Sequence, residues 1–390
     1  MCASARIAPG RGAYLVSRDR GTDIVPGHPS VRGREVHAGM EMKTAEFRAR
    51  AREEKPAWVS KLKRFETPSA GRVAVQLVDT LIPYLALLVL MDMTIFWSLP
   101  YWVTLLIAVP AGALLVRLFI FFHDCCHGSY VRSQLGLRVI GNILGVITFT
   151  SYSDWRYSHG IHHSTSGNLD RRGIGDLWTM TVEEYAAASK PTRLLYRVFR
   201  NPFFLFGVIP AFSYLILHRF PTRHSHKSQN LSILYTDIAL AGIIVAAALT
   251  IGIKAYLMIQ LPIMIIGGAG GVWLFYIQHQ FDPSYWARTE EWGSMESALQ
   301  GSSWYRLPKI LQWVSGNIGF HHIHHLRPRI PNYNLERCLN ETPELQLPDS
   351  LSLWRSLKSV RLKVWDEKEK ALLTFRQLSR MLRQRLVTER

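Results

Sequence analysis

The stretch WVTLLIAVPAGALLVRLFIFFHDCCH, residues 102–127, joins a long apolar run to a short histidine motif. The apolar part, residues 102–122, is close to the roughly 20 residues that cross a bilayer as an α-helix, and it ends directly before His123 and His127. Because residues four apart lie on one helical face, both imidazoles would project together from the end of a span. The stretch therefore predicts a histidine-bearing site at a membrane surface.

Three further runs are long and apolar enough to span a membrane. They cover residues 73–91, 235–253 and 255–277, and together with 102–122 they form two helical hairpins. Lysine and arginine are missing between residues 72 and 117, and only Lys254 lies between residues 227 and 288. Since basic residues favour the cytoplasmic side, we expect a multi-pass protein of the cytoplasmic (inner) membrane whose hairpin turns lie outside.

The composition agrees with this topology. The 390 residues are 48% hydrophobic and carry a formal net charge of +17, which the cytoplasmic segments would place beside anionic membrane lipids. The charge then needs no nucleic acid to explain it, and we expect no nucleic acid as a partner. Two shorter apolar runs, 202–217 and 139–149, are expected to lie in the interface or to dip in and return.

The chain is thereby divided into four parts. They are a disordered basic tail (1–40), a cytoplasmic amphipathic lead-in (41–70), the membrane domain (71–340) and a basic amphipathic C-terminal helix region (341–390). The predicted fold is an all-α integral membrane protein. It has four transmembrane helices in two hairpins, interfacial helices and a cytoplasmic helical domain that carries the histidines.

Eight of the 15 histidines fall into three clusters with helical spacing. They are His123 and His127, then His159, His162 and His163, and finally His321, His324 and His325. Spacings of three and four residues put each cluster on one helical face, and all clusters lie on the predicted cytoplasmic side, so they can converge. A ninth, His279, follows the fourth span and a continuous helix would bring it to the same side. His322 lies off the shared face and is left out.

The number of histidines favours two metal ions. A structural zinc takes four ligands and a catalytic zinc three, so eight or nine imply two metals with open positions for an exogenous reactant. Imidazole suits zinc, copper and iron, and ligand type alone does not select among them. Cys125 and Cys126 point away from the face that His123 and His127 share, and we expect them to pack as small apolar residues behind the site.

These motifs and their intervening sequence resemble the integral-membrane fatty acid desaturases. The resemblance covers about residues 70–340 and extends beyond the histidine motifs, to VWLFYIQHQF (272–281) and NIGFHHIHHLRPRIPNYNLERC (317–338). It is strongest to the bacterial omega-6 (delta-12) type. It implies a di-iron centre held by the eight clustered histidines and His279. Cys126 stands where the family commonly has glycine, which concerns helix packing more than ligation.

Polar residues beside the clusters are candidates to hold the imidazoles. Metal-bound histidines usually donate their second ring nitrogen to a carboxylate or carbonyl, and we expect this role of Asp124 and Asp154, with Asn317 as a further candidate. For Asp170 and Asp176, a place in a solvated loop or a helix cap is an equal alternative.

An apolar tunnel beneath the histidines is expected to hold the substrate. The aromatic residues Trp155, Tyr157 and Trp178 lie near the clusters in sequence and are candidates to line it. They could equally be interfacial anchors, because tryptophan and tyrosine are enriched at membrane surfaces.

The resemblance implies an oxidoreductase that introduces a cis double bond into a fatty acyl chain, carried as a lipid or thioester. Its cofactors would be two iron ions, with O2 as co-substrate and electrons from an external donor. The sequence carries no motif of a fused electron carrier, so we expect a separate ferredoxin-like or other small redox protein to dock on the basic face.

Two other functions stay open at this point. A fatty acyl or carotenoid hydroxylase or ketolase could use the same centre. A non-enzymatic membrane metal-binding protein is less favoured, because a transport path would need acidic residues along the spans and only Asp79 and Asp237 lie there.

Overall fold

The computed structural model describes residues 56–222, 225–347 and 349–388. Contacts divide the chain into two compact units, of which the larger contains Lys61–Arg390 and the smaller is Ser4–Ser60. In the smaller unit the described residues are 56–60, most of them in helix α2 (Ala57–Lys61). The expected tail (1–40) and the first half of the lead-in (41–55) thus lie outside the described residues.

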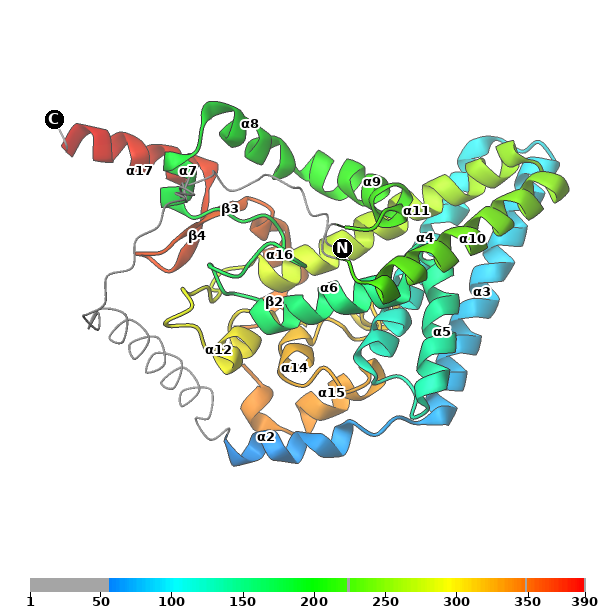
Figure 1. Ribbon diagram of the computed structural model, residues 1–390, viewed down its shortest axis with the longest axis horizontal. Coiled ribbons are helices and arrows are strands. Elements are labelled where there is room, and N and C mark those ends of the chain that lie inside the picture. The colour runs from blue at the N-terminus through cyan, green and yellow to red at the C-terminus, as the bar shows by residue number, and fades with distance from the viewer. Residues whose placement is uncertain (1–55, 223–224, 348, 389–390) are drawn as a thin grey trace, which may run out of the picture. The chain divides into compact units, whose positions relative to one another are not determined.

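Four helices of the larger unit are long and apolar enough to cross a membrane. They are α3 (Ala70–Phe96), α4 (Tyr101–His127), α10 (Lys227–Thr250) and α11 (Ile253–His279). The side chain of Ser69 caps α3, and α4 ends at Gly128, whose φ of 71° lies in the left-handed region. Figure 1 shows the four spans on the right of the view. The two predicted hairpins are confirmed.

Two pairs of shorter helices bend sharply and meet the criteria for a span only together. Helix α5 (Gln134–Ile147) meets α6 (Tyr152–Thr165) at 96°, and α8 (Lys190–Phe199) meets the segment Phe204–Arg219 at 64°. That last segment consists of the π-helical turn η2 (Phe204–Val208), α9 (Ile209–Leu215) and η3 (Leu217–Arg219). The two bent pairs contain the apolar runs 139–149 and 202–217, for which an interfacial or re-entrant path was predicted.

Shorter elements make up the rest of the described chain. The helices are η1 (Leu62–Phe65), α7 (Val182–Ala187), α12 (Ser294–Leu299), α13 (Lys309–Val314), α14 (His321–Leu326), α15 (Asn332–Asn340), η4 (Pro343–Leu345), α16 (Leu353–Ser359) and α17 (Phe375–Thr388). The strands are β1 (Tyr305–Arg306) and β2 (Leu351–Ser352), which pair in parallel, and β3 (Leu362–Asp366) and β4 (Ala371–Thr374), which pair antiparallel. The fold is mainly helical, as predicted.

The C-terminal region differs from the helical region expected for 341–390. Helices α16 and α17 are present, but the hairpin of β3 and β4 separates them. Val364 and Trp365 are buried in this hairpin, and the Trp365 N–H donates to the carbonyl oxygen of Met180 at 3.0 Å. A short buried strand and a buried helical turn have the same apolar content, so the leucine-rich sequence alone did not reveal the hairpin.

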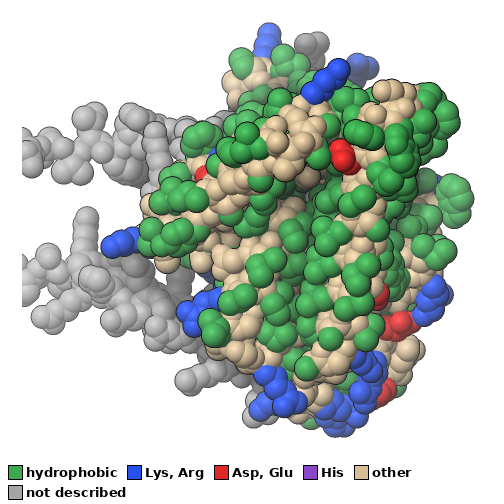
Figure 2. Space-filling model, turned by 90° about the vertical axis from the view of Figure 1, so that its right-hand side faces the viewer, with side chains coloured by type: hydrophobic (Ala, Val, Ile, Leu, Met, Phe, Trp, Pro, Cys, Tyr) green, Lys and Arg blue, Asp and Glu red, His purple; other side chains and the backbone are tan. Residues whose placement is uncertain are grey.

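Apolar side chains cover the outer face of the spans. Phe96 of α3 and Leu249 of α10 are 81% and 82% exposed. Figure 2 shows hydrophobic side chains over this side of the molecule, with lysine and arginine at its margins, many of them along the lower edge. An apolar surface of this extent marks a membrane contact rather than a water-exposed face.

Helix α4 is the central span. In its most apolar window 61% of the residues are buried, against 17–33% in the other three spans. It packs closely on α11 through small residues, because a Cβ added at Gly112 would lie 2.7 Å from Cγ2 of Ile266 and 3.1 Å from the backbone nitrogen of Gly267.

This contact predicts the effect of a larger side chain. Gly112→Val should force α4 and α11 apart and lower the stability by about 1–3 kcal/mol, the usual effect of overpacking. Gly242→Val is the matched control, since nothing lies within 4 Å of a Cβ at Gly242. Thermal unfolding in detergent should show a lower midpoint for the first variant only, and equal midpoints would contradict this packing.

Candidate metal centre

Four separate helices bring the predicted histidines together. His123 and His127 occupy the last turns of α4, while α6 carries His159, His162 and His163. His279 is the last residue of α11, and α14 begins with His321 and carries His324 and His325. On α4, α6 and α14 the spacing of three or four residues turns the rings toward one side.

The nine histidines form two groups. The five-histidine group consists of His123, His127, His159, His163 and His324. The four-histidine group consists of His162, His279, His321 and His325. Within each group one nitrogen per ring can be chosen so that all of them lie within 4.8 Å of one another.

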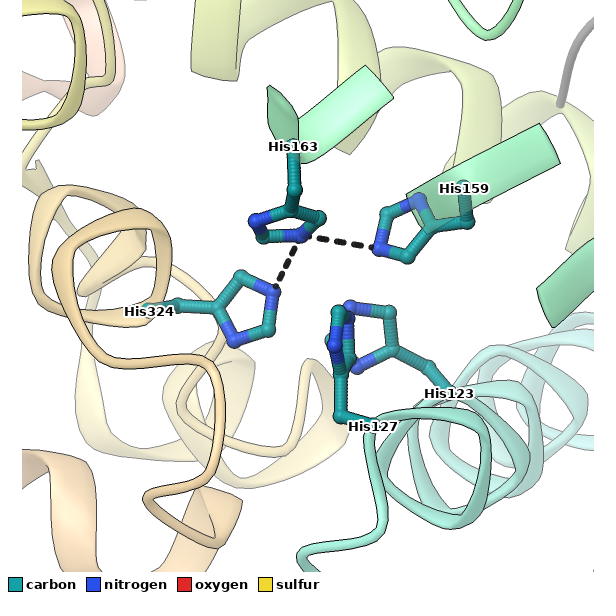
Figure 3. A group of neighbouring side chains, drawn as sticks. All are labelled: His123, His127, His159, His163 and His324. Carbon is teal, nitrogen blue, oxygen red and sulfur yellow. Dashed lines mark hydrogen bonds between the residues drawn. The ribbon is translucent and has the colours of Figure 1, made fainter. Parts of the chain in front are cut away.

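In the five-histidine group the rings converge around His163. Its Nε2 atom lies 3.1 Å from Nε2 of His159 and 3.1 Å from Nε2 of His324 (Figure 3). In the four-histidine group, Nε2 of His279 lies 3.1 Å from Nε2 of His162 and equally far from Nε2 of His321. Every ring therefore directs a nitrogen toward its own group's centre.

The chemistry of these nitrogens fits a cation. The Nε2 atoms of His127 and His325 are buried and have no hydrogen-bond partner among the described residues. Burial, and next the nearby His163 ring, hold the pKa of His325 well below its usual range. The pKa of His324 is lowered in the same way, by burial and then by His123. Neutral imidazoles with converging lone pairs are the form that binds a metal ion.

His322 lies outside both groups. Its ring is fully buried, and Nε2 lies 3.0 Å from the carbonyl oxygen of Leu345. This is the contact of a packing histidine that joins α14 to η4. Its position agrees with the sequence pattern, which put it off the face that the other three histidines of its cluster share.

Asp124 is in contact with a grouped histidine. Its Oδ1 atom lies 3.3 Å from Nδ1 of His123, while Oδ2 accepts hydrogen bonds from the backbone N–H and the side-chain amide of Asn332, at 2.7 and 2.9 Å. The side chain of Asn317 makes no hydrogen bond to a histidine of the described residues and instead donates to the carbonyl oxygen of Asn332 at 3.1 Å. Asn317 is thus three contacts away from His123, with Asn332 and Asp124 between them.

Asp176, rather than Asp154, holds a ring of the second motif. Its Oδ1 atom lies 2.7 Å from Nδ1 of His162. The approach needs glycine at position 175, where φ is +87° and a Cβ would lie 2.6 Å from Cβ of His162. The Asp154 carboxylate makes no hydrogen bond to a histidine in the described part of the chain. Asp176 lies in an irregular loop without periodicity, so sequence spacing could not place it against α6.

An apolar cavity leads to both histidine groups. Its walls come mainly from α4 and α11, with further residues from α6 and α9 and with Thr148 and Ile318 between helices. Its lining includes His123 and His159 of the five-histidine group and His321 of the four-histidine group. A flexible hydrocarbon could therefore be placed against both groups at once.

Of the three aromatic residues proposed to line a tunnel, Trp155 alone lines this cavity. It also stacks on His159, with ring centroids 4.1 Å apart. Tyr157 is 43% exposed and contacts His226, while Trp178 packs against Tyr196 and Phe199. Tyr157 is two residues after Trp155 on α6 and so faces another way, and Trp178 follows the loop that carries Asp176. Those two proposals are wrong for this cavity.

The cysteines lie behind the histidines. Cys125 and Cys126 are buried and free, and Cys126 Sγ lies 3.9 Å from the carbonyl oxygen of Tyr152 at the start of α6. Neither thiol belongs to a histidine group. The cysteine that replaces the expected glycine is therefore accommodated at the contact between α4 and α6.

Comparisons with known proteins agree with this arrangement. The family model for fatty acid desaturases matches residues 96–357. The chain is 41% identical to a fatty acid desaturase of Bacillus subtilis (strain 168) over 312 residues, which are 80% of this chain and 88% of that protein. The chain belongs to the fatty acid desaturase family. The predicted family and enzyme class, an acyl desaturase, are confirmed.

More distant relatives of this desaturase carry more specific names. An sn-1 oleoyl-lipid 12-desaturase of Synechocystis is 27% identical over 247 residues, 61% of this chain and 67% of that protein. An sn-2 acyl-lipid omega-3 desaturase (ferredoxin) of Arabidopsis thaliana is 29% identical over 261 residues, 62% of this chain and 54% of that protein.

The contact between Asp176 and His162 predicts a selective loss of metal. Asp176→Asn should weaken metal retention by about 10- to 100-fold, the usual effect of removing a carboxylate that orients a ligand histidine. Asp154→Asn is the matched control and should retain metal as the wild type does. Metal content of the desaturase after stepwise chelator dialysis measures this. Equal loss from both variants would contradict the assignment of Asp176.

Proposed function

We propose that this desaturase holds two iron ions, one in each histidine group, and introduces a cis double bond into a fatty acyl chain. The overall reaction takes a CH2–CH2 unit, O2, two external electrons and two protons to CH=CH and two waters. The observation that carries the proposal is the apolar cavity, because histidines of both groups line it.

The chain's own residues would bind and orient the substrate. The cavity lining includes Leu115, Val116 and Phe119 of α4 together with Met264 and Leu274 of α11. They offer an alkyl chain hydrophobic contact and no hydrogen bonds, so binding rests on burial and shape. The same walls would keep bulk water from the reacting carbons. Bound iron would supply the oxidising power for breaking unactivated C–H bonds.

An omega-6 or delta-12 position for the new double bond is the regiospecificity we favour. The oleoyl-lipid 12-desaturase named above and an omega-6 fatty acid desaturase of Glycine max, 24% identical over 300 residues, support it. Other relatives are named omega-3 desaturases, so the names of the relatives leave the omega-3 position as the alternative. A hydroxylase with the same centre is the second candidate, since the site itself would serve it equally.

The membrane orientation and the partners belong to the same proposal. Apart from Lys254, neither hairpin turn carries a basic residue. This distribution supports an inner-membrane protein with its histidines on the cytoplasmic side. The substrate would be a fatty acyl lipid or thioester. A separate donor, ferredoxin-like or another small redox protein, would deliver electrons, and the ferredoxin named for the Arabidopsis relative supports that class.

Product analysis tests this function. The purified protein would be placed in vesicles of phospholipid with defined acyl chains, together with ferredoxin, its reductase and O2. We expect an O2-dependent loss of two hydrogens from the acyl chain and a cis double bond, and no product from the His162→Ala/His163→Ala variant. Hydroxylated chains would favour the second candidate. Unchanged acyl chains, both in the phospholipid and in an acyl thioester added in its place, would contradict both.

A further inference from the structure

Arg117 is a buried charge inside the central span. It lies on α4, ten residues before the helix ends at His127, and 3% of the residue is exposed. A charged side chain within a membrane span is costly and persists where it has partners and a role. It belongs neither to the histidine groups nor to the lining of the cavity.

Three elements meet at its guanidinium group. Nε donates to Oγ1 of Thr80 on α3 at 2.9 Å, and Nη2 lies 3.7 Å from Oδ2 of Asp79 on the same helix. Nη1 donates to the carbonyl oxygen of Trp313 on α13. The guanidinium carbon also lies 4.0 Å from the centroid of the Trp313 ring. Arg117 therefore fastens α13 to the α3–α4 hairpin.

An ordinary interfacial arginine would look different. Such a side chain extends its charged end into water while its alkyl part covers apolar surface. Here the side chain is 4% exposed, and the charged end is covered by Trp313. A planar group with several fixed donors suits this three-way contact, and a lysine ammonium cannot reproduce it.

The segment held by Arg117 leads directly to the reacting region. After α13 the chain turns at Gly316, where a Cβ would lie 2.8 Å from Cγ2 of Ile120 on α4. Ile318 follows and lines the cavity, as Val116 and Ile120 of α4 do. Helix α14 then begins with His321, which also lines the cavity. The segment 313–321 therefore contributes Ile318 and His321 to the cavity and leads into the third histidine cluster.

We propose that Arg117 is a positioning residue for regiospecificity. By holding α13 against α4, it fixes where Ile318 and His321 stand relative to Val116 and Ile120 of α4, and so decides which methylene stands at the histidines. This rests on the proposed function, because it concerns where the double bond is placed. Arg117 touches neither the substrate nor the reacting atoms.

Arg117→Lys tests the proposal with two readouts. Backbone hydrogen exchange of residues 309–326 should become about tenfold faster, because losing the Arg117 contacts should raise the population of the locally open state about tenfold. In the product assay, the share of double bonds one or two carbons from the main position should rise about tenfold, because small misplacements at a reacting centre change relative rates strongly. The metal content should stay at the wild-type value.

Thr104→Val is the matched control. It removes the buried 2.7 Å contact between the hydroxyls of Thr94 and Thr104, which also joins α3 to α4 but does not reach α13. We expect it to leave the exchange of 309–326 and the product positions unchanged. Thr80→Val removes one of the Arg117 contacts and gives a milder form of the same test if Arg117→Lys does not fold.

Three outcomes would overturn the proposal. The first is that Arg117→Lys exchanges residues 309–326 at the wild-type rate. The second is that Arg117→Lys exchanges them faster but places the double bond as the wild type does. The third is that the Thr104→Val control changes both readouts as much as Arg117→Lys does. A wild-type protein that makes no double bond would instead contradict the proposed function. The exchange measurement would still decide, without any product, whether Arg117 holds the segment.

Discussion

The structure depends on packing nine imidazoles against one another in a buried site. Buried polar nitrogens without hydrogen-bond partners destabilise a fold, and His127 and His325 each have such an atom. Two cations, one at the centre of each group, would bind the converging lone pairs. The destabilising nitrogens would then become ligands that join α4, α6, α11 and α14. Metal binding and folding of this region would then be coupled, because the ligand set exists only when all four helices are in place.

Helix α4 connects this site to the membrane. Its last turns supply His123 and His127, its middle supplies one wall of the cavity, and its contact with α11 sets the cavity's width. Asp124 extends the connection to α15 through Asn332. A rigid central helix with ligands at one end and substrate contacts along its length places the hydrocarbon and the histidines in one frame, which selective oxidation of one methylene requires.

The sequence predicted what repeats with a helical period. The four spans, the two hairpins and the convergence of the nine histidines follow from apolar run length, basic-residue distribution and spacings of three and four residues. It did not predict contacts made by irregular segments. Asp176 reaches His162 from a loop, Asn332 reaches Asp124 from more than 200 positions away in the chain, and Tyr157 and Trp178 turn away from the cavity. These positions depend on tertiary packing, as does the hairpin of β3 and β4.

Metal analysis of the purified protein tests the central claim most directly. The variants would be His163→Ala in the five-histidine group, His279→Ala in the four-histidine group, and His226→Ala, which belongs to neither group, as the control. Mass spectrometry should find about two irons per chain in the wild type and the control, and about one in each grouped variant, because each group would hold its own ion. Zinc in place of iron, a single metal in the wild type, or iron content indifferent to both grouped histidines would contradict the account.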